Sequence, residues 1–95
     1  MALPAFADRL EGRWHAAEGR PEQAQEFLQK ARDGFERVEA RWELACTDLD
    51  LARCLIARGQ SQRARELLEA AASVFEDLRA RRELAAAREL LSETA

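Results

Sequence analysis

The sequence repeats itself with a fixed period, and this period constrains the fold more than any other feature. When residues 17–45 are aligned with residues 57–85, 13 of the 29 pairs are identical. Composition alone would match about a tenth of the pairs, so the two segments are copies of one structural unit. A chain of 95 residues therefore holds two such units and a remainder within one domain.

Each copy contains a stripe of apolar residues with helical spacing. In the first copy the stripe consists of residues spaced four, three, four and three positions apart, which are Ala24, Leu28, Ala31, Phe35 and Val38. Residues three and four apart lie on one face of an α-helix. The second copy has the same stripe at the equivalent positions, ending at Leu78. We expect the small Ala side chains to let a neighbouring helix approach, with Phe and Leu filling the space beside them.

The composition agrees with an all-helical chain. Ala occupies 20 positions, Arg supplies 14 of the 15 basic residues, and there are only two Pro and no Tyr. Ala, Leu, Arg and Glu have high helix propensity, so the composition excludes a sheet protein. The excess of Ala and Arg is also typical of GC-rich genomes, which predicts a bacterial source.

Two kinds of junction separate the helices that the stripes predict. Gly19 and Gly59 are placed to end helices in the left-handed conformation, and Pro21 suits the first position of the next helix. The segments 38–41 and 78–81 contain neither Gly nor Pro, so the chain either turns there or continues as a helix of about 57 Å. Such a helix is too long for a compact domain of this size, which favours turns near 39–41 and 79–81. We expect helices at about 4–18, 21–38, 41–58, 61–78 and 81–93.

The placement of small and large residues resembles the tetratricopeptide repeat in its longer, 40-residue form. The residues that carry the resemblance are Gly12, Gly19, Ala24, Leu28 and Ala31 in the first repeat, and Leu51, Ala52, Leu55, Gly59, Ala64, Leu68 and Ala71 in the second. The resemblance implies antiparallel helical hairpins stacked as a short right-handed array in a single domain, residues 1–95. Repeat 1 would span about 4–40 and repeat 2 about 41–80, with a C-terminal capping helix at about 81–93.

The first predicted helix departs from this pattern. It carries Glu11 and His15 where the second repeat has Leu51 and Leu55. Its own apolar stripe runs through Leu3, Phe6, Ala7, Leu10, Trp14 and Ala17, one residue out of phase, which is a rotation of about 100°. This helix is therefore expected to be tilted, to act as an N-terminal cap, or to begin inside a longer array.

In repeat arrays, one face of each first helix lines a concave binding surface. By the repeat register, the candidate partner-binding residues on that face are Phe6, Arg9, Arg13, Leu49, Arg53, Ile56 and Glu89. An exposed apolar residue on such a face is typical of a docking site for a peptide or helix. The alternative is that Leu49 and Ile56 pack against an adjacent helix. Arg13 and Arg53 could hold carboxylates, which allows an acidic partner, but the chain contains no Asn for a chaperone-type carboxylate clamp.

Other classes of function are disfavoured. The net charge of -3 argues against nucleic-acid binding, and the basic cluster at 79–82 has acidic neighbours. Cys46 and Cys54 are about 12 Å apart along one helix, too far for a disulfide, and they lack partners for a metal site. We find no catalytic, cofactor-binding or metal-binding candidates. Without a membrane span or a signal sequence, a cytoplasmic location is expected.

These observations predict a protein–protein interaction module that is not an enzyme. The partner would be a peptide, a helix or a neighbouring domain. The resemblance further implies a scaffold or sensor region like those at the C-termini of bacterial signalling ATPases, cyclases and transcriptional regulators. The alternative is a structural unit that self-associates, either as a homodimer or by exchanging a helix across the junction at 39–41.

Overall fold

The structure is a computed structural model that describes residues 3–94. The expected domain limits, residues 1 and 95, lie outside the described residues. Helices cover almost all of this range, and their bounds are Leu3–Ala17 (α1), Pro21–Arg37 (α2), Arg41–Ala57 (α3), Ser61–Asp77 (α4) and Arg81–Glu93 (α5). Each expected helix is present, with ends that differ from the expected ones by at most one residue.

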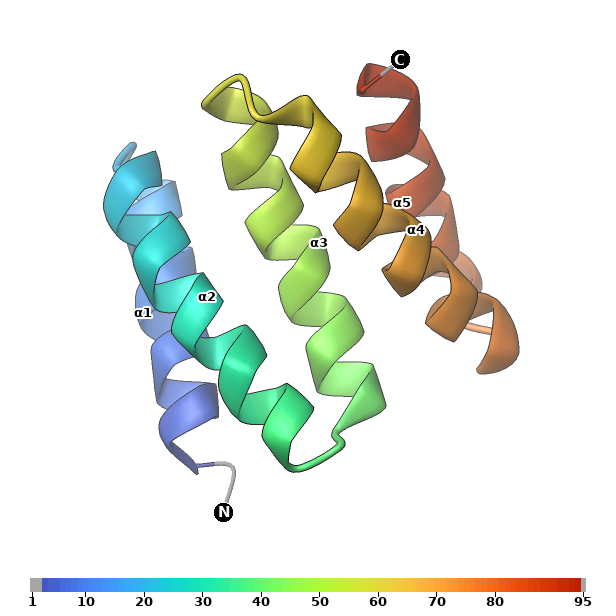
Figure 1. Cartoon of the computed structure of the whole chain (residues 1–95), viewed down its shortest axis with the longest axis horizontal. Helices are drawn as coiled ribbons and strands as arrows, with labels where there is room; N and C mark the ends of the chain where they lie inside the picture. The colour runs from blue at the N-terminus through green and yellow to red at the C-terminus, as the bar shows by residue number, and fades with distance from the viewer. Residues whose placement is uncertain (1–2, 95) are drawn as a thin grey trace.

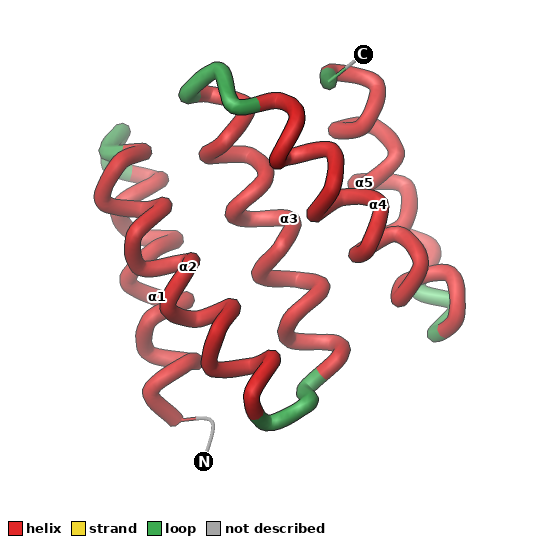
Figure 2. Tube along the Cα trace, in the orientation of Figure 1, coloured by secondary structure: helices red, strands yellow, loops and turns green. Residues whose placement is uncertain are grey.

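The helices form consecutive antiparallel hairpins arranged in two layers (Figure 1). Each helix packs against the next one in the chain, and α3 also contacts both α1 and α5. As a result α1, α3 and α5 form one layer and α2 and α4 the other, joined by short loops (Figure 2). The described residues measure 29 × 28 × 19 Å along their principal axes. The prediction of an all-α array of stacked hairpins is confirmed.

All four interhelical turns have the same backbone geometry, whether or not they contain glycine. The residue with positive φ is Gly19, Glu39, Gly59 or Arg79, at regular intervals along the chain and with φ between 55° and 76°. In each turn the next amide bonds back to the carbonyl five residues earlier, as from Ala40 to Phe35. This pattern is the Schellman motif that closes helix C-termini. The chain therefore turns at residues 38–40 and 78–80 and does not continue as a long helix.

The repeated apolar stripe forms most of the core. Leu28 and Phe35 and their second-repeat counterparts, Leu68 and Phe75, have no exposed surface, and the Ala residues of both stripes are equally buried. The expected last members of the stripes differ. Val38 and Leu78 are 40% and 48% exposed, because each is the C-cap residue where the helix has already ended.

Two glycines set the close approach of α1 to α2. A Cβ atom added to Gly12 would lie 2.6 Å from Cγ of Leu28, and one added to Gly34 would lie 2.8 Å from Cβ of Ala5. Both distances are shorter than carbon–carbon contacts allow, so neither position has room for a side chain. The glycines thus act from both helices of the hairpin, which packs more tightly than its alanine content alone would permit.

Helix α3 is central and is buried on most of its surface. Ala45, Leu51, Ala52 and Leu55 belong to the core cluster that it shares with α2, α4 and α5. One polar core residue, Thr47, has no exposed surface, and its hydroxyl donates a hydrogen bond to the Glu43 carbonyl at 2.7 Å. The helix therefore connects the two hairpins and supplies side chains to both, which places it at the base of any site between them.

Candidate functional site

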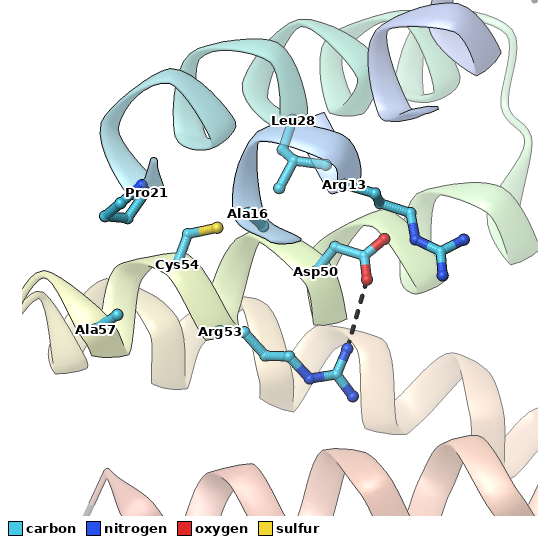
Figure 3. Close-up of a pocket in the computed structure, with 8 residues that line it drawn as sticks. All are labelled: Arg13, Ala16, Pro21, Leu28, Asp50, Arg53, Cys54 and Ala57. Atoms are coloured by element: carbon cyan, nitrogen blue, oxygen red, sulfur yellow. Dashed lines mark hydrogen bonds and ion pairs between the residues drawn. The ribbon is translucent and has the colours of Figure 1, made fainter. Parts of the chain in front are cut away.

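A groove between α1 and α3, with the first half of α2 behind it, contains a pocket of about 410 Å³ (Figure 3). Its lining comes from α1 and α2, which form the first hairpin, and from α3, which packs against that hairpin. The lining residues are Arg13, Ala16, Pro21, Leu28, Asp50, Arg53, Cys54 and Ala57. The pocket lies on the face formed by α1 and α3, as the repeat register predicts for a binding surface. We call it the groove pocket.

The groove pocket has an apolar end and a charged end. Pro21, Cys54 and Ala57 lie together at one end, and the side chains of Arg13, Asp50 and Arg53 lie at the other (Figure 3). Pro21 is present because it begins α2 after the Gly19 turn, where its missing amide hydrogen is not needed. The arrangement therefore combines a surface for an apolar group with charged groups that can orient a polar one.

Asp50 is the centre of the charged end. Its Oδ2 atom accepts a hydrogen bond from Nε of Arg9 in α1 at 3.0 Å, and its Oδ1 atom accepts one from Nη1 of Arg53 at 3.4 Å. The Asp50 side chain is only 14% exposed, whereas Arg53 is 53% exposed. Asp50 thus holds Arg9 against α3 and holds the more exposed Arg53 loosely, because the longer contact is weak and solvated.

The charged end has an excess of positive charge. Arg9, Arg13 and Arg53 supply three positive charges, and Asp50 supplies one negative charge, which leaves two positive charges at this site. The whole chain, by contrast, has a net charge of -3. Guanidinium groups bind carboxylates through paired hydrogen bonds, and only one of the two exposed Arg side chains has a contact to Asp50. The groove pocket can therefore accept a carboxylate together with an adjacent apolar group.

The structure brings together some of the predicted binding residues but not others. Arg9, Arg13 and Arg53 meet around Asp50, as described above. Leu49 is only 6% exposed and belongs to the core, so the expectation that it is exposed was wrong, and a charge at this position would disrupt packing. Ile56 is half-buried and packs against the same core, in agreement with the alternative interpretation of both residues.

The two remaining predicted residues lie outside the groove pocket. Phe6 is 48% exposed, and its ring meets that of Phe35 edge-on at a centroid distance of 4.9 Å. It borders a smaller hollow on the outer side of α1, which it shares with Arg9 and Arg13. Glu89 is exposed on α5 and does not line the groove pocket. Phe6 and Glu89 therefore do not line the groove pocket, although Arg13 borders both the groove pocket and the hollow beside Phe6.

A second acidic residue of α3, Asp48, forms a buried ion pair. Its carboxylate is 3% exposed and accepts a hydrogen bond from Nε of Arg32 in α2 at 2.8 Å. Burial of the carboxyl group raises the pKa of Asp48 to about 6, and the attraction of Arg32 offsets this effect only in part. This pair joins the first repeat to the second, and it lies apart from the groove pocket.

The two cysteines are free thiols within the described residues. Cys54 is buried at the apolar end of the groove pocket, and desolvation raises its pKa, with a further increase from the charge of Asp50. Burial also raises the pKa of Cys46. Both thiols therefore stay protonated near neutral pH and are poor nucleophiles.

Within residues 3–94, the structure groups no three His, Cys, Asp or Glu side chains in a way that could hold a metal ion. In the same range, none of the helices is long and apolar enough to cross a membrane.

The repeat register predicted the Arg residues of the groove pocket, but it did not single out Asp48 or Asp50 as partners for Arg side chains. Both acids lie in the otherwise apolar centre of α3, and Asp50 occupies the position that Leu10 has in the first repeat. For Asp50, a charged residue at a repeat position that is Leu elsewhere was the available signal, whereas Asp48 aligns with Asp8 and Arg88 and gave no such signal. The roles of both acids depend on the Arg residues of α1 and α2, which approach α3 only in the folded array.

The fold defines a class of protein, the helical-hairpin repeat arrays, whose stacked units create extended concave binding surfaces. A family model of the tetratricopeptide repeat matches residues 5–77 of this chain. The chain therefore belongs to the tetratricopeptide repeat family, as its residue pattern predicted. No curated protein and no solved structure gave a significant match in the corresponding comparisons.

Proposed function

We propose that this protein binds a peptide or a helix of a partner protein in the groove between α1 and α3. Members of the tetratricopeptide repeat family generally serve as protein-interaction modules, and the family is a non-catalytic scaffold. The partner segment would place an apolar side chain at the Pro21 end of the groove pocket and an acidic group beside Arg13 and Arg53. We further propose a regulatory or scaffold role in a bacterial signalling protein, in the cytoplasm.

The positive charge in the groove carries this proposal. In an acidic chain, Arg13 and Arg53 lie beside a single partly buried carboxylate and next to an apolar pocket wall. A carboxylate ligand can form a paired hydrogen bond with either guanidinium group without displacing the Arg9–Asp50 contact. A basic or a purely apolar segment has no such complement in the groove pocket. The neighbouring positive potential also predicts faster association at low ionic strength.

A random peptide library displayed on phage would test this proposal. We expect the peptides that the protein selects to be enriched in Asp or Glu next to Leu, Ile or Phe. Synthetic versions of these peptides, measured by fluorescence anisotropy, should bind the R13E/R53E variant at least about tenfold more weakly than the original protein. Their affinity should also fall as the salt concentration rises.

The matched control is R82E, which makes the same change of charge at an exposed position in the first turn of α5. Glutamate is favourable near a helix N-terminus, so this variant should fold and bind as the original protein does. In NMR spectra, a selected peptide should shift the amide signals of Ala16, Cys54 and Ala57. Equal binding by R13E/R53E and R82E, or selected peptides without acidic residues, would contradict the proposed site.

A second candidate function is self-association, because helix α1 exposes four large apolar side chains on its outer face. The alternative form of self-association, exchange of a long helix across residues 38–40, has less support. That turn is closed by the hydrogen bond from the Ala40 amide to the Phe35 carbonyl at 3.0 Å.

A further inference from the structure

Helix α1 has an unusual outer face. Leu3, Phe6, Leu10 and Trp14 are exposed by 68%, 48%, 71% and 51%, and they follow one side of the helix. They are four of the seven large apolar residues that are exposed in the described part of the chain. Together they present roughly 500 Å² of apolar surface, as much as the largest patch on a typical monomer. We call these four residues the α1 patch.

The α1 patch occupies a face that the second repeat covers. Ala7, Leu10 and Trp14 correspond to Thr47, Asp50 and Cys54 of α3, which are buried or nearly buried against the preceding hairpin. Helix α1 contacts only α2 and α3 and has no hairpin before it in the described residues. Its outer face therefore has the residue types of an interface but no neighbour. This accounts for the shifted apolar stripe of the first helix.

The other end of the array is polar. The large apolar residues Leu84, Leu90 and Leu91 of α5 are partly buried and pack against the core. The exposed side chains of α5 are Arg81, Arg82, Ala85, Arg88, Glu89, Ser92 and Glu93. An end-to-end contact between copies would cover the α1 patch with this charged surface. Of these two contacts between copies, the one between two α1 helices covers apolar surface with apolar surface, and such a contact is closed by a two-fold axis.

The spacing of the stripe suits a pair of helices. Leu3, Ala7, Leu10, Trp14 and Ala17 advance by four, three, four and three residues, which is the core spacing of a two-stranded coiled coil. Two copies of the α1 patch bring together about 1,000 Å² of apolar surface, before flanking residues are counted, which reaches the size of a specific interface. The second copy of this chain is therefore the occupant that fits the patch best.

Charges beside the stripe distinguish the two possible orientations. Arg9 and Arg13 lie along one edge of the stripe, and Glu11 and Glu18 lie along the other. A parallel pair sets opposite edges against each other, whereas an antiparallel pair sets like edges together. In a parallel pair, Arg13 faces the residue five positions later in the partner, which is Glu18. The Glu18 amide still bonds to the Trp14 carbonyl at 3.0 Å, so this residue continues the helical turn.

We propose that two copies of this chain form a parallel, two-fold symmetric dimer through the α1 patch, with an Arg13–Glu18 ion pair on each side of the seam. This dimer does not depend on peptide binding in the groove pocket, although Arg13 lies between the two surfaces. It specifies the surface, the orientation and the charge pairs of the association. Neither the groove nor the family supplies these features.

Sedimentation equilibrium over a range of concentrations tests the dimer. The full chain should approach twice its monomer mass of 10.8 kDa, whereas L10E should stay monomeric, with a dissociation constant at least about a hundredfold higher. Leu10 is 71% exposed, so the substitution leaves the fold intact, which circular dichroism can verify. The control is L78E, a similar change at a 48% exposed residue outside α1, which should dimerise normally. A monomer at all concentrations, a larger assembly, or equal effects of L10E and L78E would overturn the proposal.

A mixing experiment tests the orientation. R13E alone and E18R alone each place like charges together at both sides of a parallel seam, so each should dimerise several-fold more weakly than the original chain. An equal mixture of the two variants restores both opposite-charge pairs, and the heterodimer should regain the original affinity. If the mixture associates no better than the separate variants, the parallel arrangement is wrong. Because L10E leaves every residue of the groove pocket unchanged, loss of dimerisation is separable from loss of peptide binding.

Discussion

Replacing Arg79 with glycine is expected to stabilise this protein, although the substitution removes a side chain. Arg79 closes the turn between α4 and α5 with φ of +56°, and Gly59 closes the preceding turn with φ of +76°. A residue with a Cβ atom is strained by about 1–2 kcal/mol in this left-handed conformation, while glycine is not. Two turns with the same backbone geometry thus contain one strained and one unstrained residue. Placing glycine at 79 and alanine at 59 should therefore change the unfolding free energy in opposite directions.

The magnitudes follow from the two turns. R79G removes about 1–2 kcal/mol of strain but adds about 0.4–1 kcal/mol of unfolded-state entropy, for a net gain of roughly 0.5–1 kcal/mol. For G59A, a Cβ atom would meet nothing within 4 Å, so its cost is conformational alone. The same two terms with reversed signs give a loss of about 0.5–1 kcal/mol. In a domain of this size, each change corresponds to a shift of roughly 2–8 °C in Tm.

Urea and thermal unfolding followed by circular dichroism would measure both effects. The control is R88G, which makes the same substitution within α5, at an Arg whose side chain is 66% exposed and has one long contact to Glu76. Glycine inside a helix should destabilise the protein by about 0.5–1 kcal/mol, opposite in sign to R79G. If R79G lowers the stability as R88G does, the turn at residues 78–80 does not hold Arg79 in the left-handed conformation, and the reasoning fails.

Two further predictions concern packing and pH. G12A should destabilise the protein by about 1–3 kcal/mol in urea unfolding, because its Cβ atom would overlap Leu28. The control is G19A, whose Cβ atom would meet nothing within 4 Å, so it should lose only about as much stability as G59A. Equal losses for G12A and G19A would contradict the close α1–α2 packing. Asp48, with a folded pKa of about 6 against an ordinary value of 3.8, holds its proton more tightly in the folded state. The stability that protonated Asp48 contributes is therefore fully present below about pH 4 and is lost as the pH rises through 6. Between pH 4 and 7, the unfolding free energy of the original protein should fall by about 1–3 kcal/mol relative to that of D48N. The opposite trend would show that Arg32, and not burial, controls the pKa of Asp48.

The structure assigned roles that the sequence left open on the binding face. The repeat register placed the Arg residues on the face of α1 and α3, because a fixed repeat period determines which side of a helix each position takes. Whether an apolar residue on that face is exposed depends on the neighbouring helices. Leu49 was expected to be accessible but is covered by the core around α3. Asp50 was missed because its importance comes from Arg9, which is distant in the sequence and adjacent only in the fold.

The sequence by itself determined the helices, their lengths and the hairpin repeat. The periodic stripe of Ala, Leu and Phe fixes helical faces locally, and 13 identities in 29 aligned pairs establish that one unit is used twice. The turns without glycine were also favoured over a continuous helix, because a helix of about 57 Å is too long for a compact domain of this size.

The tertiary structure decided the conformation of Glu39 and Arg79, the lining of the groove pocket and the exposure of the α1 patch. The physical reason is that local spacing fixes which residues share a helix face, while the packing of distant helices fixes whether that face meets protein or solvent. Leu10 and Asp50 show the difference, since they hold the same repeat position. Within residues 3–94 a hairpin packs before the helix of Asp50 but not before that of Leu10, and the Asp50 side chain is 14% exposed where Leu10 is 71% exposed.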